Sequence, residues 1–454
     1  MRRTIPTLAA LAFLGCSGGG GPLPDAGTTP NDASTDAYVS PPIDGNGFDV
    51  NAPRPDAFVA HDDAGAAPAT VAERARAIAT TLRGDAHFLV GMGNDLDGPP
   101  DYDPDMAGVF TLGTTLDIHY TYLNGYSNSG GWTTWNSPAG EYAGILADHC
   151  VTHGGLAPMF TYYDLALEYE NHVDALRDAA LMHVYLSDVR LLFQRLATYG
   201  RPALVQFEPD FFGYMQGVMR DAATTPDAYA AELHFSDVPE CSGVPSTAAG
   251  LVECFDAMRD AIAPMVLIGL HASSWGDWWD DTSASPGEIE THAQAVAAFL
   301  LAMRADLTDF VTVEALDRDA GFWETSGGGA TCSITGGSRG AVYWDESNAT
   351  RPNFQDHIHW VGALTTAMGR PALWWQVPFG APSTMCGGAG GGSDGHWRDN
   401  RVHYFFQHTD QLVAAGAFGV VFGTGAGRQT YIDSDGGQFH DAVNAYFASP
   451  TPLP

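Results

Sequence analysis

The sequence predicts an α/β protein, a (β/α)8 TIM barrel preceded by a disordered N-terminal tether. Three observations lead to this prediction. Apolar, β-rich runs recur eight times after about residue 70, and helical patterns separate most of them. Near-continuous apolar strands that alternate with helices indicate a parallel sheet covered on both faces, and eight such units are typical of a barrel. The residues before these units contain almost no bulky apolar side chain.

Residues 1–16 have the pattern of a lipoprotein-type signal peptide. Met1-Arg2-Arg3 is basic, and the apolar run Ile5 to Leu14 is too short to span a bilayer as a helix. Phe13-Leu14-Gly15-Cys16 resembles a bacterial lipobox, in which Cys16 becomes the lipidated first residue, although Phe13 stands where Leu is usual. The expected product is exported and either lipid-anchored through Cys16 to a bacterial membrane, the outer one by preference, or released outside the cell.

Residues 17–69 predict a disordered linker rich in Asp, Ala, Pro and Gly. The segment carries eight Asp and one Arg, so it cannot bury enough apolar surface to offset the entropy of ordering. We expect this tether to hold the downstream domain away from a membrane surface.

Residues 70–450 predict the barrel domain. The first helix is expected over Val71 to Leu82. The expected strands are Ala86–Gly91, Thr115–Tyr122, Leu156–Tyr162, Ala203–Phe207, Met265–Leu270, Phe310–Glu314, Ala372–Gln376 and Gly419–Gly423. The other expected helices are Tyr142–His153, Tyr185–Tyr199, Thr247–Ile262, Glu288–Leu307, Phe354–Met368, Arg398–Ala415 and Phe439–Phe447. A doubly wound open sheet is the alternative, but no Gly-x-Gly-x-x-Gly opens a helix after the first strand, so the sequence gives no support for a dinucleotide site.

Charge excludes several classes of function. The 454 residues carry 54 acidic and 20 basic side chains, a formal charge of −34, and every basic residue is arginine. The absence of lysine excludes Schiff-base chemistry, a P-loop and a Ser-Lys dyad. The acidic balance argues against nucleic acid and against docking on anionic lipid, so a membrane contact is expected only through the Cys16 anchor.

Cysteine usage agrees with export. Cys241 and Cys254 bracket a short loop and suit a local disulfide, and Cys332 with Cys386 offers a second pair. Cys150 lies in an apolar helical stretch and is expected to be a buried free thiol. No Cys-x-x-Cys is present, so zinc and thioredoxin-like readings have no support.

Candidate site residues follow from the rule that barrel active sites lie at the carboxyl ends of the strands. These positions are rich in carboxylates and aromatic rings, a composition that suits carbohydrate, because sugar rings stack on Trp and Tyr and hydroxyls bond to polar side chains. We expect substrate-binding roles for Asp95, Asp117, His119, Tyr163, His271, Trp275, Asp319, Trp375 and Gln376.

The eight-unit pattern with acidic, Trp-rich strand ends resembles the secreted TIM-barrel glycoside hydrolases over about residues 70 to 448. Glu208-Pro209-Asp210 is similar to the Glu-Pro-Asp of cellobiohydrolase-type enzymes, although three residues do not assign that family. The largest clan of retaining barrel enzymes carries Asn-Glu after strand four and a nucleophilic Glu after strand seven. This sequence has Phe207-Glu208 and Gln376 at those places, which argues against that mechanism.

Glycoside hydrolysis needs two carboxyl groups, one protonated and one ionised. We therefore expect Glu208 to be the general acid and Asp317 the base or nucleophile, ahead of Asp319 and Glu314 on the same strand end. Asp210 would tune the pKa of Glu208 or share its role. Asp317-Arg318-Asp319 also suits a purely structural, salt-bridged loop.

Other site types have weaker support. The acidic run Asp95 to Asp105 suggests calcium, but it lacks EF-hand spacing and the closing Glu. His119 and His271 would suit a metal-dependent hydrolase, but the barrel amidohydrolases need a His-x-His after the first strand, and this sequence has none there. Ser273 and Ser274 lack a Gly-x-Ser-x-Gly elbow. The sequence therefore predicts no metal and no cofactor.

Two classes of function remain open. The first is a glycoside hydrolase that acts on a polysaccharide or oligosaccharide of glucan type. The second is a catalytically silent surface lipoprotein that binds glycans. Either would have carbohydrate as its partner and is expected to be a monomer.

Overall fold

The computed structural model describes residues 69–93, 108–114, 116–167, 172–277, 286–315, 344, 346–349, 353–385, 397–423, 430–432 and 434–454. The predicted signal peptide, the lipidation site Cys16 and nearly all of the tether lie outside these residues, so those assignments stay predictions. Asp95, Asp317, Asp319 and the pair Cys332 and Cys386 also lie outside them.

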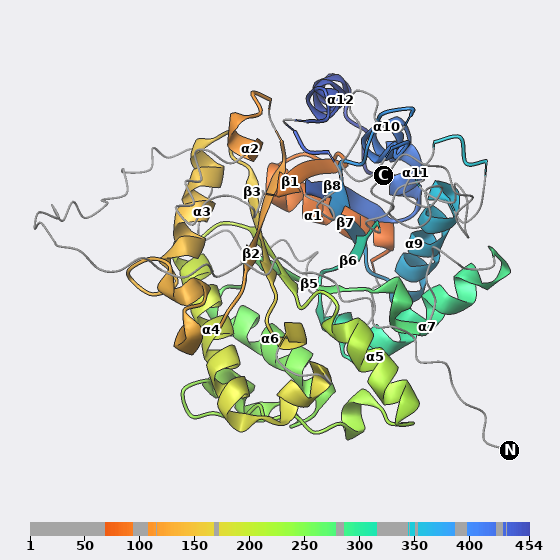
Figure 1. The fold of residues 1–454 in the computed structure, drawn as a ribbon. Helices are drawn as coiled ribbons and strands as arrows, with labels where there is room; N and C mark the ends of the chain where they lie inside the picture. The colour runs from red at the N-terminus through yellow and green to blue at the C-terminus, as the bar shows by residue number, and fades with distance from the viewer. Residues whose placement is uncertain are drawn as a thin grey trace, which may run out of the picture.

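Eight parallel strands form a closed barrel in sequence order, which confirms the predicted fold class. Figure 1 shows the strands in the centre of the molecule with helices around them. The strands are β1 Leu89–Gly93, β2 Ile118–Leu123, β3 Ala157–Tyr162, β4 Ala203–Phe207, β5 Val266–His271, β6 Phe310–Glu314, β7 Ala372–Pro378 and β8 Ala417–Gly423.

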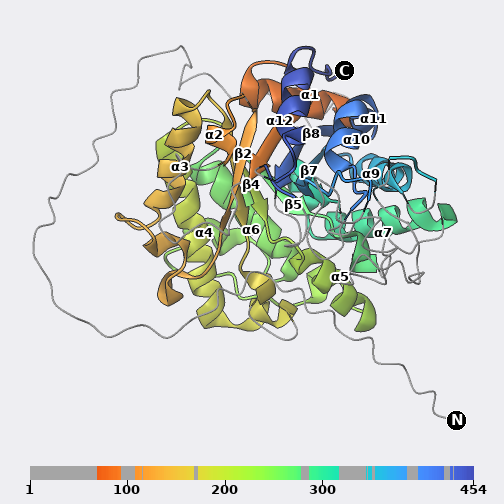
Figure 2. The ribbon, with the colours of Figure 1, turned by 45° about the horizontal axis from the view of Figure 1, so that its top comes forward.

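The helices cover the outside of the barrel, and the turned view in Figure 2 shows α3 and α4 on one side of the strands and α7 and α9 on the other. Their bounds are α1 Val71–Arg83, α2 Gly108–Thr111, α3 Glu141–Thr152, α4 Ala179–Tyr199, α5 Phe211–Asp221, α6 Ala248–Ile262, α7 Ile289–Ala302, α9 Phe354–Met368, α10 Arg401–Gln407, α11 Thr409–Ala414 and α12 Gln438–Phe447.

Three predicted helices have different bounds, and helices α2 and α5 were not predicted. The helix expected over 185–199 begins six residues earlier, at Ala179. The helix expected over 288–307 ends at Ala302, and a short 3-10 turn, Ala305–Leu307, follows it. The helix expected over 398–415 is two helices, α10 and α11, which meet at His408. Helix α5 follows Asp210 directly, and the sequence pattern had not indicated it.

The two ends of the domain meet where the barrel closes. Strand β1 pairs with β8 from Leu89 with Gly419 to Met92 with Phe422. The C-terminal tail extends this contact, because Leu453 N donates to Ala86 O at 2.9 Å and Phe88 N donates to Thr451 O at 2.8 Å. The C-terminal tail therefore lies beside the segment that leads into β1.

Cysteine pairing agrees with the expectations that can be checked. Cys241 and Cys254 form a disulfide between the segment before α6 and α6 itself. Cys150 is a buried free thiol on α3. Among the described residues, no helix is both long and apolar enough to cross a membrane.

Two buried aspartates clamp the amino-terminal end of the barrel in the same way. Asp117, just before β2, accepts a hydrogen bond from Val90 N of β1 at 3.0 Å and pairs with Arg83 Nε of α1 at 3.0 Å. Asp309, just before β6, accepts from Ile268 N of β5 at 2.9 Å and pairs with Arg259 of α6 at 3.1 Å. Each carboxylate thus links the start of its own strand to the neighbouring strand and to the helix that precedes that neighbour.

We predict that Asp117→Ala lowers the free energy of unfolding by about 1–3 kcal/mol, because it leaves the buried Val90 N–H unpaired and removes the carboxylate that pairs with Arg83. Asp117 also raises the pKa of His87 by accepting its hydrogen bond. The stability gained from the charged His87–Asp117 pair is complete below 6.5, the pKa of histidine in the unfolded chain. It is lost as pH rises through the raised pKa of His87 in the folded protein. The loss of stability measured by urea unfolding should therefore shrink as pH rises above about 6.5.

The control is Asp85→Ala, which removes a carboxylate that is 81% exposed and 3.7 Å from the same imidazole. It should cost less than about 1 kcal/mol. Equal losses in the two variants would contradict the clamp.

Candidate functional site

The carboxyl ends of β2 to β7 bring polar and aromatic side chains together at one end of the barrel, which we call the mouth. Its described members are Tyr122, Tyr163, Asp210, Tyr214, His271, Trp275, Glu314, Trp375 and Gln376. Of the residues predicted from the sequence, the mouth unites Tyr163, Asp210, His271, Trp275, Trp375 and Gln376.

Strand β7 directs two consecutive side chains to the mouth through a bulge. Trp374 pairs with Val420 but Val377 pairs with Phe422, so β7 holds one extra residue, and Gln376 has a φ of 50°. Trp374 faces outward and donates from Nε1 to His357 Nε2 on α9 at 3.0 Å. Trp375 packs inside against Tyr122, and Gln376 accepts a hydrogen bond from the Tyr122 hydroxyl at 2.8 Å.

The end of β4 sends its two carboxylates in different directions. Glu208 and Asp210 both have positive φ, 53° and 67°, which is uncommon for residues other than glycine. Glu208 is 0% exposed, and its carboxylate accepts from Asp164 N at 3.2 Å and Leu165 N at 2.9 Å in the loop after β3. Burial, and then the charge of Asp164, raise the pKa of Glu208 well above its ordinary value.

Asp210 occupies the place that the sequence had given to Glu208. It stands at the start of α5 without making a capping hydrogen bond, and its carboxylate lies at the mouth. The Tyr163 hydroxyl donates to Asp210 Oδ2 at 3.4 Å. The expectation that Glu208 faces substrate therefore gives way to a supporting position behind the mouth, because its carboxylate is held by the backbone of the β3 loop.

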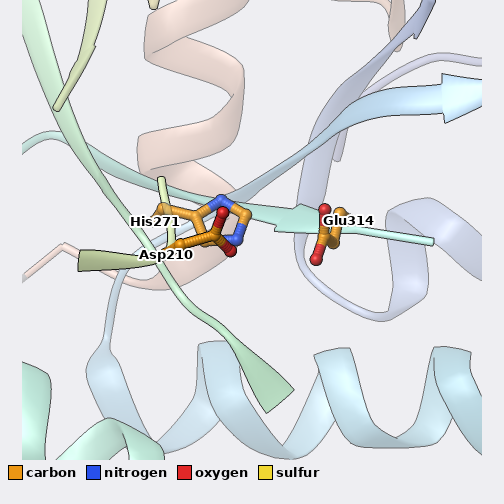
Figure 3. Close-up of side chains that lie close together, drawn as sticks. All are labelled: Asp210, His271 and Glu314. Atoms are coloured by element: carbon orange, nitrogen blue, oxygen red, sulfur yellow. The ribbon is translucent and has the colours of Figure 1, made fainter. Parts of the chain in front are cut away.

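Asp210, His271 and Glu314 form the centre of the mouth. One ligand-type atom from each side chain lies within 4.8 Å of the other two. Figure 3 shows that they come from the loop after β4 and from the ends of β5 and β6. Such a set could hold a metal ion, although the sequence patterns had given little support to a metal site.

The imidazole of His271 is held by side chains of the neighbouring strands β4 and β6. Its Nδ1 lies 3.3 Å from Thr312 Oγ1 and 3.4 Å from Gln206 Nε2, and its ring makes an edge contact with Trp375. His271 is 1% exposed, and burial lowers its pKa to about 3. The ring is therefore neutral at physiological pH, with a fixed orientation.

Aromatic rings flank the cluster. Tyr122 and Tyr163 lie side by side with ring centres 6.2 Å apart, and Tyr122 adjoins Trp375 at 5.8 Å. On α5, Tyr214 packs against Trp275 at 4.9 Å. Burial, and then the charge of Asp210, raise the pKa of both Tyr163 and Tyr214.

Two predicted substrate-binding residues lie elsewhere. Asp117 precedes β2 rather than following it, so it belongs to the clamp at the opposite end of the barrel. His119 faces outward under α3, 0% exposed, with Cys150 Sγ 3.7 Å from its Nδ1. Burial lowers its pKa to about 3, so it is a neutral core residue.

Sequence reasoning missed Tyr122 and Tyr214 as mouth residues. Tyr122 could have been found from alternation, because it is two residues after Tyr120 on the same face of β2. Tyr214 lies four residues after Asp210, a helical spacing that would have been informative only once α5 was recognised.

No protein-family model matches this sequence, and no curated protein matches it. Solved structures resemble the fold at low identity. The GH53 catalytic domain of Ignisphaera aggregans is 9% identical with a TM-score of 0.39, over 80% of this chain and 98% of that chain. The β-mannanase of the blue mussel Mytilus edulis is 8% identical with a TM-score of 0.40, over 82% and 95%. The D-psicose 3-epimerase of Clostridium cellulolyticum H10 is 11% identical with a TM-score of 0.37, over 79% and 97%. Likeness of this size carries no argument about function, which therefore rests on the site.

We predict that Glu208→Gln gains stability relative to the parent as pH rises from about 4.5. A carboxyl group whose pKa is raised in the folded state costs stability once the unfolded chain can ionise it, and glutamine has no such cost. Denaturant unfolding of both proteins between pH 4 and pH 8 measures the difference. Glu208→Ala is the comparison, because it leaves the Asp164 and Leu165 N–H groups unpaired and should be less stable at every pH. A parent–glutamine difference that does not vary with pH would contradict the assignment.

Proposed function

We propose that this protein is a glycoside hydrolase that acts on a polysaccharide or oligosaccharide of glucan type. The observation that carries the proposal is the pair Asp210 and Glu314, whose carboxylate oxygens lie within 4.8 Å of each other in a mouth lined by aromatic rings. Two facing carboxyl groups are the essential equipment of glycoside hydrolysis.

The separation favours retention of configuration. Retaining enzymes hold their two carboxyl groups about 5–5.5 Å apart, and inverting enzymes hold them about 6.5–9.5 Å apart to admit a water molecule. We assign Asp210 as the nucleophile, because the Tyr163 hydroxyl donates to it and so favours its ionised form. Glu314 then donates its proton to the leaving oxygen as that oxygen separates from the anomeric carbon. Asp210 bonds to the same carbon, and water, deprotonated by Glu314, releases the sugar.

The remaining mouth residues suit the binding of a sugar. Tyr122 and Tyr163 are partly exposed rings near the pair, and Trp275 is a partly exposed ring that packs against Tyr214. All three offer apolar faces for pyranose rings. Gln376 presents an amide to sugar hydroxyls from the β7 bulge. The proposal differs from the sequence-based one in both roles, since Glu314 replaces Glu208 as the general acid and Asp210 takes the nucleophile's role expected of Asp317.

We predict that Asp210→Asn and Glu314→Gln each lower kcat by about 10²–10⁴-fold, the range that positioned proton transfer and its partner groups contribute. Release of reducing ends from a panel of soluble glucans and mannans measures the rate. Azide should restore activity to the variant of the nucleophile, Asp210, by supplying a small anion in its place.

The controls are Asp227→Asn and Glu232→Gln, the same substitutions at exposed positions, and both should match the parent. Parental rates in both Asp210→Asn and Glu314→Gln would refute the assigned pair. A parent that cleaves no glycan but is retarded in a glucan affinity gel would establish the silent, glycan-binding alternative instead.

Export and anchoring are part of the proposal. We propose that Cys16 carries the lipid and that residues 17–69 keep the mouth clear of the membrane surface. Metabolic labelling with a fatty acid should mark the parent and leave Cys16→Ala unlabelled.

A further inference from the structure

His271 is placed as a ligand rather than as part of the hydrolytic pair. Its Nδ1 lies 3.3 Å from Thr312 Oγ1 and 3.4 Å from Gln206 Nε2, while its Nε2 is buried and has no hydrogen-bond partner among the described residues. A buried nitrogen without a partner costs free energy, so its retention needs an explanation. One nitrogen of this ring lies within 4.8 Å of an oxygen of Asp210 and an oxygen of Glu314.

We propose that Asp210, His271 and Glu314 bind one divalent first-row transition ion, and that its binding stops hydrolysis. The inhibitory part rests on the proposed function, because it uses the same two carboxylates. The site itself does not depend on that function.

The donor set selects the kind of ion. One imidazole nitrogen with two carboxylates suits zinc, cobalt or manganese, whereas magnesium and calcium prefer oxygen ligands alone. In the tautomer whose Nδ1–H donates to Thr312 Oγ1, the lone pair of Nε2 is available to a metal, and this contact orients the ring as the outer partners of metal-bound histidines do. Bonds of about 2.0–2.2 Å bring ligand atoms to roughly 3–4 Å from one another. Binding therefore draws the two partly exposed carboxylates inward.

Inhibition follows because the metal ion and the hydrolytic reaction use the same carboxylate lone pairs. An ion bonded to Asp210 removes the electron pair that would attack the anomeric carbon. An ion bonded to Glu314 displaces the proton that the leaving oxygen needs. Three protein ligands leave a position for water, but the space between the carboxylates is no longer open to the sugar.

The test is a titration of the full chain with Co²⁺, whose visible absorption bands report nitrogen ligation. Excess Mg²⁺ is included to occupy the many oxygen-only acidic sites of a chain with a charge of −34. We expect one Co²⁺ per chain, with bands that His271→Asn abolishes and Glu314→Gln weakens. Thr312→Val, which removes the hydroxyl that accepts from Nδ1–H, should weaken binding by about 10–100-fold.

His119→Asn is the matched control. His119 is also fully buried and neutral but lies outside the mouth, so this variant should keep the cobalt bands. Glu314→Gln changes a partly exposed residue, and it keeps the test valid if the His271 variant fails to fold.

Hydrolysis is measured in the same samples. The rate should fall in proportion to the fraction of chains that carry cobalt, and the loss should be reversed by a chelator. No cobalt bands in the parent would refute the site, whether or not glycans are cleaved. Bands with an unchanged rate at saturation would refute the inhibition. Bands in a parent that cleaves no glycan would refute the proposed hydrolase while supporting the site.

Discussion

Tyr120 fills the barrel on the side where it closes, and the position of the mouth depends on this packing. Its ring lies across β1 and β8, where Gly93 and Gly423 face it. A Cβ atom at Gly93 would lie 2.2 Å from the Tyr120 ring, and one at Gly423 would lie 1.9 Å from its hydroxyl. The Tyr120 ring also contacts Trp375 at 6.1 Å. One half of the lumen is therefore closed by aromatic rings, and the polar groups gather on the other half, at β4 to β6.

The chain uses backbone irregularities to choose which side chains reach that open half. Regular strands send alternate residues inward, so a residue next to a lumen-facing one should point into the helices. The β7 bulge breaks this rule for Trp375 and Gln376. The left-handed residues at the end of β4 break it again, since they turn Glu208 into the wall and Asp210 into the mouth. Strain of this kind is costly and persists where the surroundings enforce it. Glu208, held by two N–H groups of the β3 loop, is the described group best placed to enforce it at β4.

These irregularities mark the limit of what the sequence could predict. Periodicity placed all eight strands, because each apolar run is buried on both faces. It could not separate Glu208 from Asp210, because two carboxylates around a proline look alike until the φ angles are known. It placed Asp117 at the wrong end of the barrel because β2 begins at Ile118, three residues later than expected, and an apolar run does not reveal where hydrogen bonding starts. It missed α5, whose first residues, Phe211-Phe212-Gly213, lack a polar capping pattern.

The two carboxylates at the centre of the mouth repel each other, and both the proposed hydrolysis and the proposed metal binding relieve that repulsion. Two ionised carboxylates whose oxygens lie within 4.8 Å of each other repel by at least roughly 3 kcal/mol at an effective dielectric constant of about 20. The neighbouring imidazole is neutral and cannot offset that repulsion. A proton or a cation shared between Asp210 and Glu314 would relieve this repulsion. A proton gives the division into acid and nucleophile that glycoside hydrolysis requires, and a divalent ion gives a stable inactive site. Because the two occupants compete for the same oxygen lone pairs, whichever binds more tightly under given conditions decides whether the barrel can act on a glycan.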